Sequence, residues 1–159
     1  MLTSRNALLP LRHAVAVRWP DLIKSNGGGS NAILVRGFGI SEHRVLRLSW
    51  LPERRWMHVV RLGNGWWVGN LHTAADARQG LRAAEALRDW AAGSPMVLGG
   101  DFNVRDLSLP GFVRVGGSGP DHVFAGGGLV GDGATQVLER GRLSDHAPLL
   151  MSVIEKGSP

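Results

Sequence analysis

The stretch MVLGGDFNVRDL, residues 96–107, runs a short apolar segment into a pair of glycines and then into spaced polar residues. The Met-Val-Leu run predicts a buried strand, and the glycine pair predicts a tight turn. Asp101 and Asn103 stand on either side of Phe102, so an extended backbone points both polar side chains to one face and Phe102 to the other. Because α/β proteins usually keep their chemistry at the carboxyl ends of strands, we expect a functional site here.

The segments on either side of this stretch alternate between strand and helix patterns. An asparagine between two glycines, residues 63–65, predicts a hairpin turn. Strands joined both by a hairpin and by a helix predict an α/β fold with a mixed sheet. We expect helices at residues 6–18 and 76–92, and strands at residues 31–36, 44–50, 55–62, 66–71, 96–98, 112–115, 121–125, 135–138 and 147–154.

The length and composition indicate one folded domain over residues 1–159. An apolar content of 43% and a charged content of 19% are typical of globular proteins, and the absence of cysteine excludes disulfides and thiolate metal sites. The net charge of +5 suits a polyanionic partner, although the arginines are spread along the chain. We see neither a signal-peptide pattern nor an apolar run of about 20 residues, so the cytoplasm is the default compartment.

Polar residues of catalytic type recur at the ends of other predicted strands. His72 follows one strand, Asp121 begins another, and Asp145 and His146 precede the last one. Each of them alone is more often a turn or structural residue than a functional one. Turn formation, however, does not require histidines at several strand ends, so the joint arrangement favours one shared site.

Four motifs occur in the order found in the endonuclease/exonuclease/phosphatase superfamily, which the chain resembles from about residue 31 to residue 153. They are NLHT (residues 70–73), GGDFN (99–103), GPDHVF (119–124) and LSDHAP (143–148), and NAILVR (31–36) resembles the central strand segment of the superfamily. The resemblance implies a four-layer α/β sandwich with two mixed β-sheets, like that of DNase I and exonuclease III.

The resemblance also implies metal-dependent hydrolysis of phosphoesters, with Mg²⁺ or Mn²⁺ as cofactor and water as nucleophile. Asp101 would position or deprotonate that water and contribute to the metal site. Asn103 would hold a phosphate oxygen, and His72 would stabilise charge on the phosphate or assist the leaving group. These roles are chemically consistent, because a negatively charged phosphodiester repels hydroxide unless cations and donors are held in place.

Two further positions follow from the SDH motif. His146 would contact the scissile phosphate while the carboxylate of Asp121 orients its ring, which would also raise the pKa of His146. Asp145 would be a metal ligand, directly or through water, because Mg²⁺ prefers hard oxygen ligands. His122 matches no required position of the superfamily, and we interpret it as structural.

The start of the chain departs from the superfamily pattern. Members begin with a strand ending in asparagine and a strand ending in a metal-binding glutamate, whereas residues 1–13 here resemble the helix that follows them. Glu42 and Glu53 come after the strand at residues 31–36, in the wrong order to replace that glutamate. We therefore expect a domain of this fold that is incomplete at its N-terminus, with exposed strand edges and weakened Mg²⁺ binding.

Three functions remain open from the sequence. The first is a phosphodiesterase of the endonuclease or exonuclease type acting on nucleic acid. The second is a catalytically impaired remnant that binds polyanions or a partner chain. The third is a phosphatase of the same fold acting on a small or lipid phosphate. The basic charge favours nucleic acid, and the six tryptophans could supply stacking surfaces, although Trp66 and Trp67 fit a core and rim position better.

Overall fold

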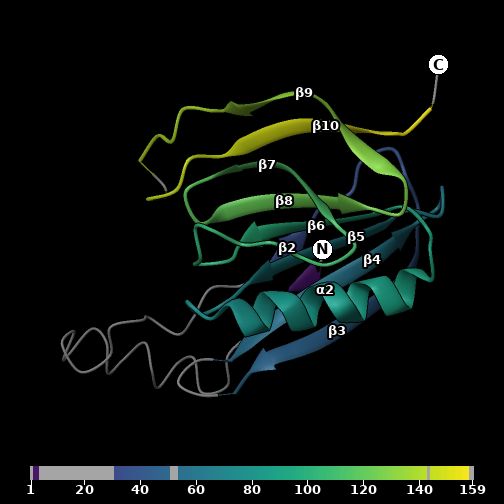
Figure 1. The fold of residues 1–159 in the computed structure, drawn as a ribbon, viewed down its shortest axis with the longest axis horizontal. Helices are drawn as coiled ribbons and strands as arrows, with labels where there is room; N and C mark the ends of the chain where they lie inside the picture. The colour runs from purple at the N-terminus through teal and green to yellow at the C-terminus, as the bar shows by residue number, and fades with distance from the viewer. Residues whose placement is uncertain (1, 4–30, 51–53, 143, 158–159) are drawn as a thin grey trace.

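The computed structural model describes residues 2–3, 31–50, 54–142 and 144–157 (Figure 1). Within these residues the elements are β1 (Leu2–Thr3), β2 (Ala32–Ile33), β3 (Ile40–Ser49), β4 (Arg55–Leu62), β5 (Trp67–His72), α2 (Ala77–Ala91), β6 (Met96–Asp101), β7 (Val113–Ser118), β8 (Asp121–Gly126), β9 (Leu129–Val137) and β10 (Leu149–Glu155). No helix in the described ranges combines the length and the apolar character needed to cross a membrane.

Six of the strands form the main sheet, in the order β3-β4-β5-β6-β8-β7. Strands β5 and β6 are parallel, because α2 carries the chain from the end of one to the start of the other, and the remaining neighbours are antiparallel. The mixed sheet and the α/β class predicted from the sequence are confirmed. Strand β4 has the predicted bounds, and α2 lies within the predicted range 76–92.

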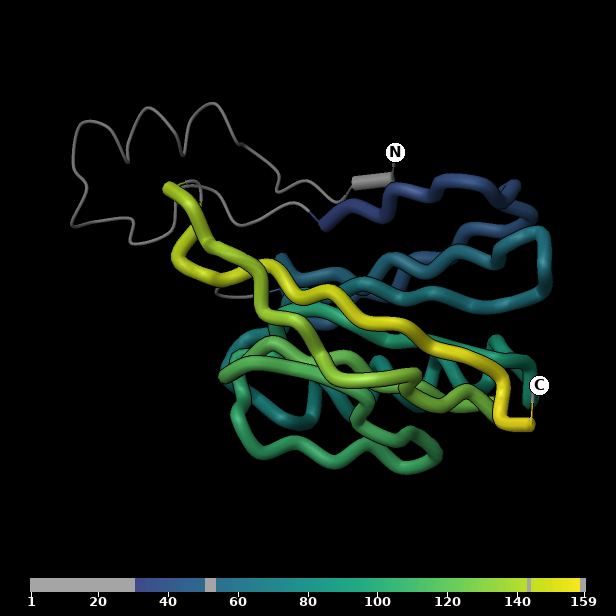
Figure 2. The backbone as a smooth tube through the Cα atoms, turned by 90° about the horizontal axis from the view of Figure 1, so that it is seen from above, coloured from purple at the N-terminus to yellow at the C-terminus, as the bar shows by residue number. Residues whose placement is uncertain are grey.

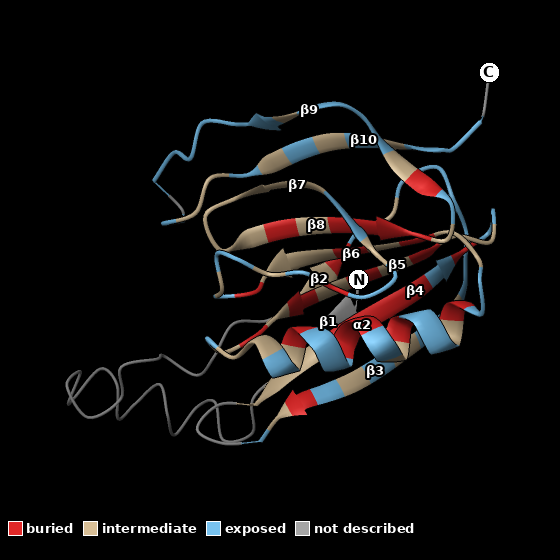
Figure 3. Cartoon of the chain, in the orientation of Figure 1, coloured by how far each residue is buried: buried red, intermediate tan, exposed pale blue. Residues whose placement is uncertain are grey.

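Helix α2 covers one face of the main sheet and buries the larger apolar core (Figure 3). Asp76 caps the helix by accepting a 3.0 Å hydrogen bond from the backbone N–H of Arg78. Gly80 lets the helix approach the chain after β6, since a Cβ there would lie 3.2 Å from the ring of Phe102. Phe102 is 1% exposed in this core, as its alternation with Asp101 predicted.

The opposite face of the main sheet carries a second apolar cluster, in which Ile33 of β2 packs against Val60 and Leu62 of β4. Strands β9 and β10 pair antiparallel and lie side by side (Figure 2), forming a separate two-stranded sheet. This sheet packs against the β7 edge of the main sheet, where a Cβ on Gly116 would collide with the side chain of Met151.

The glycine pair after Leu98 does not form the predicted tight turn. Strand β6 continues to Asp101, and Gly100 keeps register with Leu71 on one side and His122 on the other. Its φ is +143°, and a Cβ would lie 2.0 Å from the Leu71 carbonyl oxygen. The glycine is required by the close approach of the β5 backbone, which sequence alone does not reveal.

Other boundaries differ where pairing extends or shortens a strand. Strand β3 begins four residues before the predicted start because its pairing with β4 continues to Ile40. Strand β9 begins at Leu129 rather than at residue 135, because it pairs with β10 along most of its length. Strand β2 covers only Ala32–Ile33, and β1 was not predicted. The predicted helix at residues 6–18 lies outside the described residues.

Candidate active site

All six residues proposed from the sequence line one open cleft of about 490 Å³. Ser144, which belongs to the same SDH motif but received no role from the sequence, lines it as well. Among the described residues the lining is His72, Asp101, Asn103, Asp121, Ser144, Asp145 and His146.

The register of three neighbouring strands brings the first half of this cleft together. His72 at the end of β5 pairs with Asp101 at the end of β6, and Asp101 pairs with Asp121 at the start of β8. Directly opposed residues project their side chains to the same face. These three side chains therefore lie in a row on the face opposite α2, although residues 72 and 121 are 49 positions apart.

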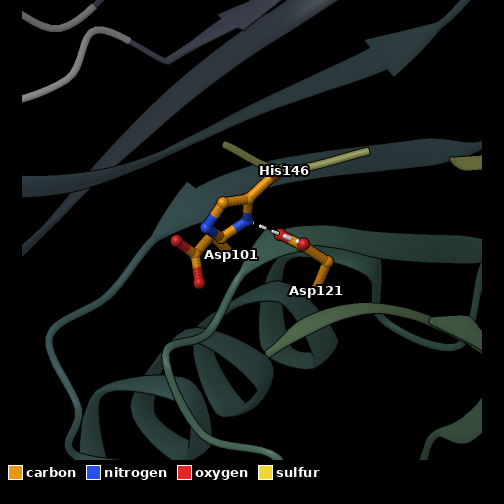
Figure 4. A group of neighbouring side chains, drawn as sticks. All are labelled: Asp101, Asp121 and His146. Carbon is orange, nitrogen blue, oxygen red and sulfur yellow. Dashed lines mark hydrogen bonds and ion pairs between the residues drawn. The ribbon is translucent and has the colours of Figure 1, made fainter. Parts of the chain in front are cut away.

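His146 reaches this row from the segment before β10. Its Nδ1 lies 2.8 Å from Asp121 Oδ2, and Figure 4 shows the ring between the carboxylates of Asp121 and Asp101. The pKa of His146 is raised above its ordinary value, first by the hydrogen bond to Asp121, and further by the negative charges of Asp121, Asp101 and Asp145, which together outweigh partial burial. The raised pKa favours the imidazolium form of His146 between these carboxylates.

Asp101 is held by groups on both sides. Its Oδ2 lies 3.3 Å from His72 Nε2, and its Oδ1 accepts a 2.8 Å hydrogen bond from the backbone N–H of Asn103. Asn103 adopts a left-handed conformation with φ +52°, which asparagine tolerates better than most residues. Its Nδ2 donates to the carbonyl oxygen of Thr73 at 2.8 Å, which fixes the amide beside the carboxylate.

Thr73 supports this loop and was not singled out from the sequence. It is 1% exposed, and its hydroxyl donates to the Phe102 carbonyl oxygen while its backbone N–H donates to the Asp101 carbonyl oxygen at 2.9 Å. Thr73 is the last residue of the NLHT motif, so the sequence could have pointed to it. Its hydrogen-bond partners lie at the end of β6 and depend on the pairing of β5 with β6.

His122 has a structural position, as interpreted from the sequence. Its ring is fully buried between Phe102 and Phe124, and its Nε2 lies 2.6 Å from the Val104 carbonyl oxygen. It projects from β8 to the side opposite Asp121, because neighbouring residues of a strand face opposite ways. His122 therefore anchors the loop after Asn103 from below the cleft.

The donor set suits a hard divalent cation. Ligand atoms of Asp101, Asp121 and His146 all lie within 4.8 Å of one another, and the exposed Asp145 lines the same cleft. Asp121 and His146 hydrogen-bond to each other within this group, and water could complete the oxygen coordination that Mg²⁺ prefers. Glu42 is ion-paired with Arg44 on β3 and does not line the cleft, and Glu53 lies outside the described residues.

No protein-family model and no curated protein matches this chain. Solved structures do match it: TDP2 from Caenorhabditis elegans has a TM-score of 0.57 at 17% identity, covering 70% of this chain and 49% of that one. An endonuclease/exonuclease/phosphatase from Bacteroides vulgatus has a TM-score of 0.60 at 13% identity, covering 75% of this chain and 67% of that one. TDP2 from D. rerio, complexed with a single-strand DNA product, has a TM-score of 0.57 at 10% identity, covering 74% and 68%.

The chain thus spans about half the length of the C. elegans protein that it matches. At these identities the likeness concerns the arrangement of helices and strands, and it covers 70% to 75% of this chain. The α/β fold implied by the motif resemblance agrees with this likeness. The chain has the fold of the endonuclease/exonuclease/phosphatase superfamily.

Proposed function

We propose that this protein is a metal-dependent phosphodiester hydrolase of the nuclease type. The observation that carries the proposal is the convergence of two histidines, an amide and three carboxylates in one open cleft at the ends of β5 and β6. Such a set supplies a base, donors for a phosphate and oxygen ligands for a cation at fixed positions.

Asp101 is the residue suited to orient and deprotonate the attacking water. The hydrogen bond to its Oδ1 and the proximity of His72 to its Oδ2 hold the carboxylate in one orientation. A carboxylate so held keeps the water in line with the phosphorus atom and accepts its proton as the bond to phosphorus forms. Asn103 has a second N–H on its Nδ2, which can donate to a non-bridging phosphate oxygen.

His146 is suited to stabilise negative charge on the phosphate. With Nδ1–H donated to Asp121, its Nε2–H is directed away from that carboxylate and can donate to a phosphate oxygen. His72 lies on the other side of Asp101 and is placed to donate to the departing oxygen. Mg²⁺ or Mn²⁺, held by Asp101 and Asp145, would supply a positive charge that offsets the charge developing on the phosphate.

Nucleic acid is the substrate class that we propose. The formal charge of +5 and the sequence pI of 11.2 favour association with a polyanion. The D. rerio neighbour, of similar fold, was solved with a single-strand DNA product, which supports this choice of substrate class. The cleft is also open to solvent, which is compatible with an extended ligand such as a nucleotide chain.

The test is hydrolysis of plasmid DNA, of single-stranded oligonucleotide and of a chromogenic phosphodiester, with Mg²⁺ or Mn²⁺ and with EDTA. Asp101→Asn and His146→Ala should each lower turnover by about 10²–10⁴-fold. Asp132→Asn removes an exposed carboxylate on β9 outside the cleft and is the matched control, with unchanged turnover expected.

Circular dichroism melts on every variant show whether loss of turnover reflects loss of fold. A folded parent chain that hydrolyses no diester with either metal would contradict the proposal and favour the impaired remnant. Hydrolysis of phosphomonoesters but not diesters would favour a phosphatase of the same fold.

A further inference from the structure

Two arginines stack against one exposed tryptophan where β3 ends and β4 begins. The guanidinium carbon of Arg54 lies 3.9 Å from the centre of the Trp50 ring, and that of Arg47 lies 5.1 Å from it. Trp50 is 50% exposed. We refer to Arg47, Trp50 and Arg54 as the Trp50 cluster.

The cluster differs from the other arginine–tryptophan contacts of the main sheet. Arg44 lies over Trp67 and Trp90 on the α2 face, but Trp67 is buried and Arg44 is ion-paired with Glu42, so that contact belongs to the packing of the helix. Among the described residues, neither Arg47 nor Arg54 has a carboxylate partner. Both guanidinium groups instead contact the Trp50 ring.

The Trp50 cluster lies at the same edge of the main sheet as the candidate active site. Strands β3, β5 and β6 run in the same direction, so their carboxyl ends meet at one edge (Figure 1). Met57 pairs with Leu71, and extending this register by two residues places Arg55 beside Thr73, next to His72. Two inter-strand spacings separate β5 from β3, which is roughly 10 Å.

Arg47 also projects to the face that bears the cleft. It pairs with Trp56 on β4, which shares a face with His58 two residues on. His58 in turn pairs with Asn70 on β5, which shares a face with His72. Arg47 and His72 thus project from the same face of one sheet, two strands apart.

We propose that the Trp50 cluster is a stacking platform for a single-stranded nucleic acid whose neighbouring phosphate occupies the cleft. An unpaired base can stack on the Trp50 ring or on a guanidinium plane that covers it, while the arginine N–H groups donate to backbone phosphates. Bases in a duplex already stack on one another and cannot do so. The inference rests on the proposed function for the position of the scissile phosphate, but binding at the cluster does not require turnover.

The test measures binding apart from catalysis, by fluorescence anisotropy of a fluorescein-labelled oligothymidylate of about twelve nucleotides, in EDTA. Trp50→Ala should raise Kd about fivefold or more, and Trp50→Phe, which keeps an aromatic face, should stay within about twofold of the parent. Arg54→Ala should weaken binding, whereas Arg82→Ala, an equal loss of charge on exposed α2, should change Kd by less than about twofold. A duplex of the same length should be affected less by Trp50→Ala than the single strand is.

The following results would contradict the proposed stacking platform. It is overturned if the parent does not bind the oligonucleotide, if Trp50→Ala binds as tightly as the parent, or if single strand and duplex weaken equally. Equal effects of Arg54→Ala and Arg82→Ala would show that net charge alone is responsible. Turnover is assayed separately, so a chain that hydrolyses nothing but binds through Trp50 overturns the proposed function and leaves the platform standing.

Discussion

The Nδ1 atom of His146 lies 2.8 Å from Oδ2 of Asp121, and this contact joins the segment before β10 to the start of β8. It links the segment before β10 to the main sheet across 25 residues of sequence, and both residues line the cleft. The orientation of the His146 ring therefore depends on a carboxylate of the main sheet.

This dependence predicts that Asp121→Asn and His146→Ala act as a unit. Each single change should lower kcat, Asp121→Asn by about 10-fold to 100-fold and His146→Ala by more. The double variant should be no slower than His146→Ala, because Asp121 then has no ring left to orient. The measurement is kcat on the chromogenic diester for all four proteins. Multiplicative losses in the double variant would show that Asp121 acts on the substrate independently.

The support of Asn103 by Thr73 predicts an effect that a structural role alone would not produce. Thr73→Val removes the buried hydroxyl that donates to the Phe102 carbonyl oxygen and should cost about 1–2 kcal/mol of unfolding free energy. It should also lower kcat about tenfold through misplacement of Asn103 and Asp101. Thr73→Ser keeps the hydroxyl and is the control. Urea unfolding and kcat are measured on both, and equal kcat for both variants would contradict the positioning role.

The position of Gly100 predicts a large loss of stability on substitution. In Gly100→Ala the new Cβ would meet the Leu71 carbonyl oxygen, and the φ of +143° is unfavourable for alanine, so the unfolding free energy should fall by roughly 2–4 kcal/mol. Gly133→Ala is the control, because its φ is +89° but no atom lies within 4 Å of the added Cβ; it should cost about 1 kcal/mol. Urea denaturation measures the unfolding free energy of both variants. Equal losses would mean that the positive φ, rather than the contact with the Leu71 carbonyl oxygen, accounts for the destabilisation.

The buried His58 predicts how stability depends on pH. Burial, and then the charge of His43, lowers the pKa of His58 below its ordinary value of 6.5. The unfolded chain therefore binds a proton near pH 6.5 while the folded chain does not, so this contribution to stability is complete above pH 6.5 and is lost as the pH falls below it.

His58→Leu should remove this dependence. For one proton the slope of unfolding free energy against pH is at most about 1.4 kcal/mol per unit, so urea melts between pH 7.5 and 5 can resolve the difference between parent and variant. Taking that difference cancels the contributions of the histidines that do not contact His58. Parallel curves for the two proteins would contradict the assignment to His58.

Local sequence patterns predicted many of the helices and strands. The strand at β4 was predicted beside the Asn-Gly hairpin turn, and helix α2 was predicted from helical spacing. Both signals act within a few residues. The glycine pair before Asp101 was misjudged as a turn, because the backbone of β5 that makes those glycines necessary is distant in sequence. Strand β9 was predicted too short for the same reason, since its length depends on pairing with β10.

The sequence by itself determined which chemical groups are present: the carboxylates, histidines and asparagine of the four motifs, their order, and the placement of each at the end of a strand. Only the tertiary structure decided which of them meet, because pairing of β5, β6 and β8 sets the row of His72, Asp101 and Asp121, and packing of the β10 segment brings in His146. The tertiary structure alone also placed the Trp50 cluster two strands from that row. Residue type and alternation are local properties of the chain, whereas register and sheet order depend on contacts between segments that no short stretch contains.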